Sequence, residues 1–327
     1  MPNNPLSIWC NARFPDPVME ILRKGTAGHR LIIAQSAKES NLIVGAPDPA
    51  LAECDVAFGQ PAAAQVAEVP RLKWVHLTTA GYDRYDTPGV RQALGDRHGM
   101  LTNSSPVYAE PCAQHGLAMM LAQARRLDWA ITDQAGDRPW SYLPIRRASN
   151  LIMGQTVLML GFGMIGKRLA ELLAPFNLRL IAARRTASGP EGAVEIIPTT
   201  QIDARLADAD HVINILPGGS ATERFMNAAK FSAMKQGAIF YNLGRGSTVD
   251  QPALIAALQS GHLGAAWLDV TVPEPLPPND PLWLAPRCHI TPHTAGGHAT
   301  EFHRLTEHFL NNLQRYTSGR ELVGRVI

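Results

Sequence analysis

The sequence predicts an α/β fold divided into two domains, each built on a parallel sheet. Its 327 residues suit roughly two domains of ~150 residues. Short apolar runs alternate along the chain with longer stretches of helix-forming residues, which is the pattern of α/β proteins. A strand, a glycine-rich turn and a helix follow one another between Thr156 and Ala174, as in a βαβ unit. Hydrophobic residues make up 46% of the chain, enough for a substantial core.

The first part of the chain carries short strand signals and one long helix signal. A run of helix formers begins at Ser105, and after Pro106 only Pro111 lies near its start, so we expect a long helix there. The polar stretch 133–150 is expected to be irregular. Apolar runs in the first hundred residues predict strands at 31–34, 56–58, 74–77 and 100–102.

The second part of the chain repeats strand and helix signals in alternation. We expect strands at 156–160, 178–182, 211–215, 238–242, 265–269 and 288–291, and helices at 167–174, 227–234 and 251–260. One nucleotide-binding domain is therefore expected over 105–294. The tail from Ala295 is amphipathic, and we expect it to be helical and to return to the first domain.

The composition argues against several classes of protein. The formal net charge is +2 without a block of Lys or Arg, unlike a nucleic-acid-binding or membrane-surface protein. The four cysteines are far apart, so we expect neither a disulfide framework nor a zinc site. We find no signal peptide and no apolar run of the ~18 residues that a membrane span needs. We therefore expect a cytoplasmic protein that binds neither nucleic acid nor membrane and holds no metal.

A glycine motif stands between the predicted strand 156–160 and the next helix. In a dinucleotide site the first glycine allows a tight turn, the second lets the backbone approach the pyrophosphate, and the third permits close helix–strand packing. The free N–H groups at the helix start favour a bound phosphate. Glycines also close ordinary turns, but the strand–turn–helix context favours a dinucleotide site. The motif consists of Gly161, Phe162, Gly163, Met164, Ile165 and Gly166.

The residues after the second strand of this unit indicate which dinucleotide is bound. NAD sites usually carry an acidic residue about 20 residues beyond the motif, where it holds the ribose hydroxyls. This chain has Arg184, Arg185 and Thr186 there instead. Because arginine at this position binds a 2′-phosphate, we expect NADP(H) as the preferred cofactor and NAD(H) as a second one. The alternative is that both arginines are solvated strand-end residues and the cofactor is NAD.

Three further residues follow predicted strands, at the edge where ligands bind in open α/β sheets. Arg245 lies in N-L-G-R-G-S-T-V-D, Glu274 in T-V-P-E-P and His293 in T-P-H-T-A-G-G. A guanidinium offers a planar fork for a carboxylate, and a histidine beside a glutamate can donate a proton near neutral pH. Each residue alone has a structural explanation, since a turn arginine is often solvated and the chain holds 11 histidines. Their coincidence in one domain favours a catalytic site.

These motifs resemble those of the D-isomer-specific 2-hydroxyacid dehydrogenase family. The resemblance covers T-T-A-G-Y-D-R-Y-D (78–86), N-S-S-P-V-Y-A-E (103–110) and the stretch 156–296. Within the family, the chain is most similar to the glyoxylate/hydroxypyruvate reductase branch. The resemblance implies an active-site cleft between two domains and a homodimer in contact through 105–150. The implied domains are a flavodoxin-like substrate domain of 1–104 with 295–327 and a dinucleotide-binding Rossmann domain of 105–294.

The resemblance also implies roles for individual residues. Arg245 matches the arginine that binds the substrate carboxylate and polarises its carbonyl. His293 matches the acid/base that protonates the ketone oxygen, and Glu274 the carboxylate bonded to that histidine. Ala80 and Gly81 match a turn whose backbone amides bind the other side of the substrate carboxylate. Asp269 matches the aspartate that holds the nicotinamide carboxamide; further cofactor contacts are expected at Leu216, Pro217, Thr222, Leu243, Gly244 and Gly296.

The resemblance therefore implies an oxidoreductase that transfers a hydride from NAD(P)H, preferably NADPH, to a small 2-oxo acid. Glyoxylate or hydroxypyruvate would be reduced to the D-2-hydroxy acid. A fixed cation and a proton donor at the carbonyl oxygen would stabilise the negative charge that develops there. One alternative is a dehydrogenase of formate or phosphite type, although formate enzymes carry glutamine at the position of Glu274. The other is a nucleotide-sensing, corepressor-like adaptor, although this chain shows no long disordered extension.

Overall fold

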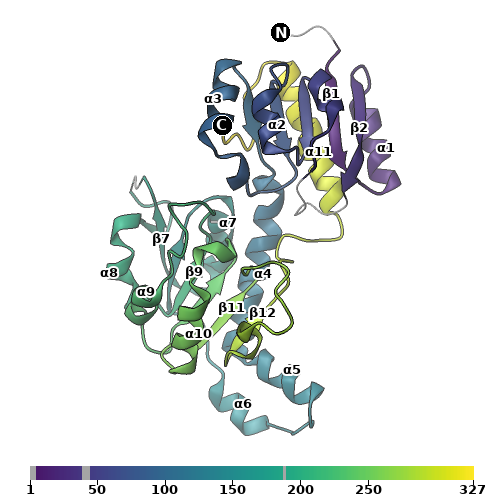
Figure 1. Ribbon diagram of the computed structural model, residues 1–327. Coiled ribbons are helices and arrows are strands. Elements are labelled where there is room, and N and C mark those ends of the chain that lie inside the picture. Colours follow the sequence, from purple (N-terminus) through teal and green to yellow (C-terminus); the bar gives the residue numbers. More distant parts are fainter. Residues whose placement is uncertain (1–4, 39–44, 187–188) are drawn as a thin grey trace. The chain divides into compact units, whose positions relative to one another are not determined.

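The computed structural model describes residues 5–38, 45–186 and 189–327 and divides the chain into two compact units (Figure 1). The first unit comprises Met1–Tyr108 with Gly297–Ile327, and the second comprises Ala109–Gly296. The named strands of each unit form one sheet and pair in parallel. The predicted α/β fold with two parallel sheets is confirmed.

The first unit holds a five-stranded sheet in the order β2-β1-β3-β4-β5, which is the flavodoxin-like order. Along β1, Ile8 and Cys10 pack in the cluster that includes residues of α1 and α11, whereas Trp9 packs in the cluster that includes residues of α2 and α3. Helices therefore cover both faces of this sheet, as parallel sheets require. Its elements are β1 (Ser7–Ala12), α1 (Asp16–Gly25), β2 (Arg30–Lys38), β3 (Val56–Gly59), α2 (Ala63–Glu68), β4 (Trp74–Leu77), α3 (Pro88–Asp96), β5 (Met100–Thr102) and α11 (Glu301–Thr317).

The second unit holds a seven-stranded sheet in the order β12-β11-β10-β9-β6-β7-β8. The strand order reverses between β6 and β9, and ligands of doubly wound sheets bind outside the carboxyl ends of the strands at this point. Its strands are β6 (Thr156–Leu160), β7 (Arg179–Arg184), β8 (Val194–Pro198), β9 (His211–Asn214), β10 (Ile239–Asn242), β11 (Ala265–Leu268) and β12 (Cys288–Ile290). Its helices are α4 (Ser105–Arg125, which begins in the first unit), α5 (Leu127–Ala135), α6 (Tyr142–Ala148), α7 (Met164–Leu173), α8 (Asp203–Leu206), α9 (Ala228–Ala233) and α10 (Gln251–Gln259).

Most predicted strands and helices lie where the sequence pattern placed them. The strands predicted at 74–77, 100–102 and 156–160 have those bounds, and β2 runs four residues beyond its predicted end at residue 34. Helix α7 begins three residues earlier than predicted because it starts inside the glycine motif, with Gly163 as its N-cap. The sequence pattern did not predict β1 or β8, both of which mix polar residues into a short apolar run.

The expectation of an irregular stretch over 133–150 was wrong, because α5 extends into it and α6 lies within it. Helix α6 buries no side chain, so it lacks the apolar periodicity that announces a helix. Local contacts form it instead: Ile145 N–H donates to the Ser141 carbonyl, and the Arg146 guanidinium lies 5.3 Å from the centre of the Tyr142 ring.

Candidate active site

The glycine motif forms a tight loop between β6 and α7. Gly161 has a φ of 99°, which favours glycine, and a Cβ there would lie 3.0 Å from the carbonyl oxygen of Ile215. A Cβ at Gly163 would meet no heavy atom of the described residues within 4 Å, so the loop surface is open there. A Cβ at Gly166 would lie only 3.2 Å from the Gly161 carbonyl oxygen. The absence of a side chain there therefore allows the helix to pack closely on the strand. This geometry fits a dinucleotide pyrophosphate at the start of α7. Of the other motif residues, Phe162 is buried, Ile165 is partly buried and Met164 is exposed.

The loops after β9 and β10 pack beside this glycine loop. Leu216 and Leu243 are buried, and a Cβ at Gly244 would lie 2.6 Å from the Leu216 carbonyl oxygen. Thr222 closes the β9 loop by donating from its hydroxyl to the carbonyl of Pro217 at 2.7 Å. The structure therefore places five predicted cofactor residues on two adjoining loops at the carboxyl edge of the sheet.

Arg245 follows β10 in a loop with fixed backbone contacts. Its Nη1 donates to the Gly244 carbonyl at 2.7 Å, and its own carbonyl accepts from the Thr248 hydroxyl at 2.6 Å. A Cβ at Gly246 would come within 2.0 Å of the Thr271 carbonyl oxygen, so only glycine lets the β10 loop lie against the β11 loop. This close approach brings Arg245 to the loop that carries Glu274.

His293 and Glu274 form a hydrogen-bonded pair. The Nδ1 atom of His293 lies 2.7 Å from Oε2 of Glu274, while Oε1 accepts from the Thr271 backbone N–H at 3.0 Å. Burial disfavours the charge on Glu274, but the hydrogen bonds from His293 and Thr271 and the charge of Arg245 lower the pKa of its carboxyl overall. Both side chains of the pair are about one-third exposed, at 28% for His293 and 33% for Glu274. We find no hydrogen bond to Nε2 of His293 among the residues that the structure describes, so this ring nitrogen can contact a ligand.

Asp269 holds the loop that carries His293. Its buried carboxylate accepts from the Thr291 hydroxyl at 2.6 Å, the Thr294 N–H at 2.8 Å and the Ala295 N–H at 3.0 Å. Its carbonyl accepts from the His293 N–H at 2.8 Å. These bonds maintain His293 at a φ of 53°, a left-handed conformation that is costly for a non-glycine residue. The described contacts of Asp269 therefore position the histidine.

His115 joins this group, and sequence reasoning did not find it. It comes from α4, and its Nε2 lies 3.1 Å from the Thr291 hydroxyl and 3.8 Å from Oδ1 of Asp269. No local pattern relates a histidine on a long helix to a threonine 176 residues further along the chain, just after β12. Gly296, the last residue of the second unit, lies at the end of the loop that carries His293.

Arg184 ends β7 beside a carboxylate that the sequence analysis overlooked. Its guanidinium pairs with Glu191, and the Nζ of Lys167 lies 2.7 Å from the same carboxylate. Arg185 and Thr186 are exposed immediately after the strand. The three residues expected at a 2′-phosphate therefore lie together, with Lys167 as an added cation.

Ala80 and Gly81 lie in the first unit, after β4. Asn103 donates from its amide to the Ala80 carbonyl at 2.6 Å, and the Thr79 hydroxyl donates to the Gly81 carbonyl at 2.7 Å. These two hydrogen bonds stabilise the turn, and in it they use only the backbone carbonyl groups of Ala80 and Gly81.

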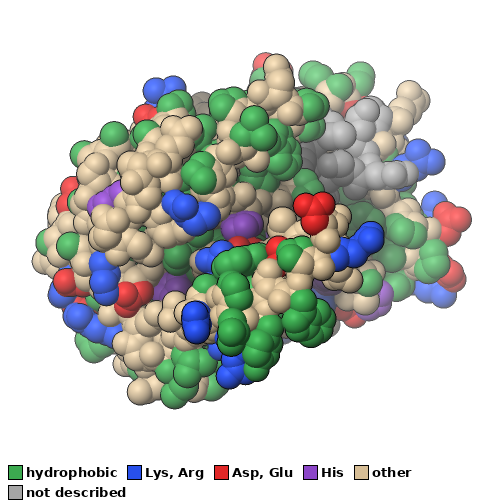
Figure 2. Space-filling view, turned by 90° about the horizontal axis from the view of Figure 1, so that it is seen from below, with side chains coloured by type: hydrophobic (Ala, Val, Ile, Leu, Met, Phe, Trp, Pro, Cys, Tyr) green, Lys and Arg blue, Asp and Glu red, His purple; other side chains and the backbone are tan. Residues whose placement is uncertain are grey.

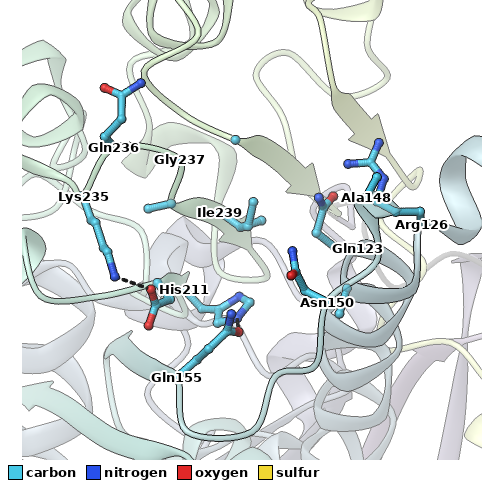
Figure 3. Close-up of a pocket in the computed structure, with 14 residues that line it drawn as sticks. Gln123, Arg126, Ala148, Asn150, Gln155, His211, Lys235, Gln236, Gly237 and Ile239 are labelled. Atoms are coloured by element: carbon cyan, nitrogen blue, oxygen red, sulfur yellow. Dashed lines mark hydrogen bonds and ion pairs between the residues drawn. The ribbon is translucent and has the colours of Figure 1, made fainter. Parts of the chain in front are cut away.

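A polar pocket of about 260 Å³ lies elsewhere in the second unit, at the amino ends of the strands (Figure 3). It is lined by Gln123, Gln155, Lys235 and the first residues of β9 and β10, His211 and Ile239. Burial lowers the pKa of His211 to about 4, so this histidine is neutral near pH 7. The carboxyl ends of parallel strands lie on the opposite edge of the sheet, so this pocket is separate from Arg245, Glu274 and His293.

A nicotinamide-dependent dehydrogenase can use a histidine and an arginine that lie at the carboxyl edge of its dinucleotide-binding sheet. A model of the NAD-binding domain of D-isomer specific 2-hydroxyacid dehydrogenases matches residues 117–295, more than half of the chain. The chain therefore belongs to this family and is an NAD(P)-dependent oxidoreductase, as the sequence analysis expected.

Relatives of known name and structure agree with this assignment. Glyoxylate/hydroxypyruvate reductase B of Klebsiella pneumoniae (strain 342) is 35% identical over 245 residues, covering 73% of this chain and 74% of that protein. A family member from Xanthobacter autotrophicus Py2, solved with NADPH and MES, is 26% identical with a TM-score of 0.80 and covers 99% of this chain and 98% of its own. A glyoxylate/hydroxypyruvate reductase of Sinorhizobium meliloti, solved with NADP and malonate, is 25% identical with a TM-score of 0.75. The match covers 99% of this chain and 97% of that protein. The predicted family and branch are confirmed.

Over residues 5–38, 45–186 and 189–327, we find no helix long and apolar enough to span a membrane.

Proposed function

We propose that this protein reduces a small 2-oxo acid of the glyoxylate or hydroxypyruvate type to the D-2-hydroxy acid, with NADPH as the preferred cofactor. The observation that carries the proposal is the His293–Glu274 pair at 2.7 Å, in which Glu274 lies on a loop packed against the loop of Arg245. The second unit provides the dinucleotide site and carries Arg245, Glu274 and His293. Named reductases of both substrates among the relatives support this substrate class.

Each residue has a distinct task in this reaction. A nicotinamide cofactor held at the carboxyl edge of the sheet would supply the hydride for the carbonyl carbon. Arg245 binds the substrate carboxylate with its planar fork and stabilises the charge that develops on the carbonyl oxygen. His293 donates the proton to that oxygen from Nε2, while Glu274 accepts the hydrogen bond from Nδ1 and favours the protonated ring. Asp269 orients the His293 loop and would hold the nicotinamide carboxamide through its carboxylate.

A turnover assay of the purified protein tests the function. Glyoxylate, hydroxypyruvate and pyruvate are offered with NADPH or NADH, and formate and phosphite with the oxidised cofactors. We expect reduction of the 2-oxo acids and no oxidation of formate or phosphite. Turnover of formate or phosphite alone, or no turnover of any substrate, would contradict the proposal.

The cofactor preference has its own test in the double variant Arg184→Ala with Arg185→Ala. A hydrogen bond to a charged group contributes about 1.5–3 kcal/mol, so losing one or two should lower kcat/KM for NADPH by at least about tenfold. Turnover with NADH should barely change, because NADH has no 2′-phosphate. Arg179→Ala, at the other end of β7, is the matched control and should leave both values unchanged. Equal efficiency with both cofactors, or a preference for NADH, in the parent protein would refute the preference.

We further propose that the protein is a homodimer in which a second copy covers helices α5 and α6. Figure 2 views the molecule from this end and shows hydrophobic side chains gathered at its surface. Leu127, Ile131, Trp140, Tyr142 and Leu143 are all exposed there, and Trp140 is 94% exposed. A large exposed apolar patch of this kind marks an interaction surface.

Sedimentation analysis of the parent and of Ile131→Glu with Leu143→Glu tests the dimer. We expect the parent to sediment as a dimer and the double variant as a monomer, because the change places two charges in an apolar contact. Leu284→Glu, at another exposed leucine, is the control and should remain dimeric. A parent that is monomeric at all concentrations tested would refute the proposal.

A further inference from the structure

Glu191 occupies the space between two cations at the end of β7. Its Oε2 lies 2.7 Å from the Nζ of Lys167, and its Oε1 accepts a hydrogen bond from the Arg184 guanidinium. The side chains of Lys167, Arg184 and Glu191 are 50%, 34% and 31% exposed, so a solute can reach this contact. A carboxylate between an ammonium and a guanidinium makes the same charge-assisted hydrogen bonds that a phosphate would make with them.

Three separate elements bring these side chains together. Lys167 is in the first turn of α7, where its N–H donates to the Gly163 carbonyl. Arg184 is the last residue of β7. Glu191 is held by the turn that enters β8, in which Glu191 and Val194 exchange backbone hydrogen bonds at 3.2 and 3.1 Å. The backbone position of Glu191 is therefore held by this turn and does not depend on the pairing of its carboxylate with the two cations.

The charges favour a stable ion cluster in the absence of cofactor. The hydrogen bond from Lys167 and the nearby cationic charges lower the pKa of Glu191, so its carboxylate is ionised at neutral pH. Lys167, Arg184 and Arg185 carry three positive charges and Glu191 one negative charge, which leaves a net charge of +2. A phosphate that entered beside Glu191 would face a like charge, so the carboxylate has to move away from the cations for the phosphate to bind them both.

We propose that Glu191 is an internal counter-anion of the 2′-phosphate subsite, which it occupies in the free protein and leaves when the 2′-phosphate of NADP(H) binds. This inference rests on the proposed preference for NADP(H). Lys167 is then a further ligand of the phosphate, together with Arg184. The carboxylate competes with the phosphate and therefore lowers the affinity for every 2′-phosphorylated nucleotide. Nucleotides without that phosphate leave the ion cluster intact.

Calorimetric titration of the whole protein with two nucleotides tests this competition. Adenosine 2′,5′-bisphosphate carries the 2′-phosphate and adenosine 5′-monophosphate lacks it, and neither needs a 2-oxo acid or turnover. The variant is Glu191→Gln, which keeps the shape and removes the charge. The control is Glu195→Gln, which removes the same charge from β8, where Glu195 pairs with Arg179 and Arg205. Low and constant ionic strength is needed because salt screens exposed charges.

We expect Glu191→Gln to bind the bisphosphate about tenfold more tightly than the parent, the effect of one charge-assisted contact. The monophosphate should bind both proteins equally, and Glu195→Gln should behave as the parent. Unchanged or weaker binding of the bisphosphate to Glu191→Gln would overturn the inference. So would weaker binding of the monophosphate, because Glu191 would then hold the ribose hydroxyls as the missing acid does in NAD sites.

The two proposals fail in different ways in this experiment. A parent that binds both nucleotides equally, together with a Glu191→Gln variant that gains affinity for the bisphosphate, refutes the cofactor preference and supports the counter-anion. A parent that prefers the bisphosphate, together with a variant that gains nothing, supports the preference and refutes the counter-anion.

Discussion

Replacing His293 with alanine should lower kcat for 2-oxo acid reduction by a factor of about 10²–10⁴, the usual contribution of a general acid. His293 is the proton donor of the proposed reaction, and its Nδ1 is already bonded to Glu274. The affinity for NADPH, measured by fluorescence titration in the absence of substrate, should change little. Initial rates at saturating cofactor and 2-oxo acid give the value of kcat.

The control for this substitution is His262→Ala in the same unit. His262 contacts the carbonyl of Met234 and the amide of Gln236, near the amino ends of the strands, and should tolerate the change with kcat within about twofold of the parent. If His293→Ala retained parental kcat, another residue would have to be the proton donor. His115, the other histidine near the Asp269 carboxylate, would be the first to test.

The conservative change Glu274→Gln tests the role of the glutamate while His293 stays in place. Burial opposes the charge of Glu274, but its hydrogen bonds and nearby cations lower its pKa, so it is ionised throughout the neutral range. Its contribution to folding stability is present above the pKa of the unfolded chain and is lost only as the pH falls through the lowered folded value. The amide should move the pH optimum of reduction downward, because a protonated imidazole loses its anionic partner. An unchanged pH–rate profile would argue against this role for Glu274.

The fold was predictable because its signals are local. The glycine motif is a contiguous segment whose spacing encodes a tight turn, an open surface and a close helix contact, and all three features are present at Gly161, Gly163 and Gly166. Buried parallel strands appear in a sequence as short apolar runs, so the bounds of β4, β5 and β6 could be predicted from the sequence. Helix α6 had no such signal, because it buries no apolar face.

The contacts that organise the site were less predictable because they join distant parts of the chain. Asp269 was expected at the nicotinamide, but its bonds to Thr294 and Ala295 show that it also holds the histidine loop. Glu191 follows Arg184 by seven residues, and only the turn into β8 brings its carboxylate back to the arginine. Sequence spacing can identify which residues follow strands, whereas three-dimensional pairing decides which of them share a ligand.

Replacing Arg245 with glutamine should lower kcat/KM for the 2-oxo acid by roughly a hundredfold or more, since losing a charge-assisted bidentate contact costs on the order of 3 kcal/mol. The loss should appear in both KM and kcat, because the guanidinium binds the carboxylate and also stabilises the developing oxyanion. Arg245→Lys should recover only part of the activity, because a point charge cannot reproduce the planar fork. Arg179→Gln, at the amino end of β7, is the control for removing one positive charge.

The division of this loss between KM and kcat tests the geometry around Arg245. Gly246 lets the arginine loop lie against the carbonyl of Thr271, and the Arg245 charge helps to lower the pKa of Glu274. If Arg245 acted only as a carboxylate ligand, the glutamine variant would raise KM and leave kcat near the parental value. If it also acts on the reacting carbonyl, kcat must fall as well, and a 2-oxo acid at saturating concentration cannot restore the rate. Near-parental kcat/KM in Arg245→Gln would show that the substrate carboxylate binds elsewhere. If the carboxylate bound to the guanidinium, removing the guanidinium would lower kcat/KM.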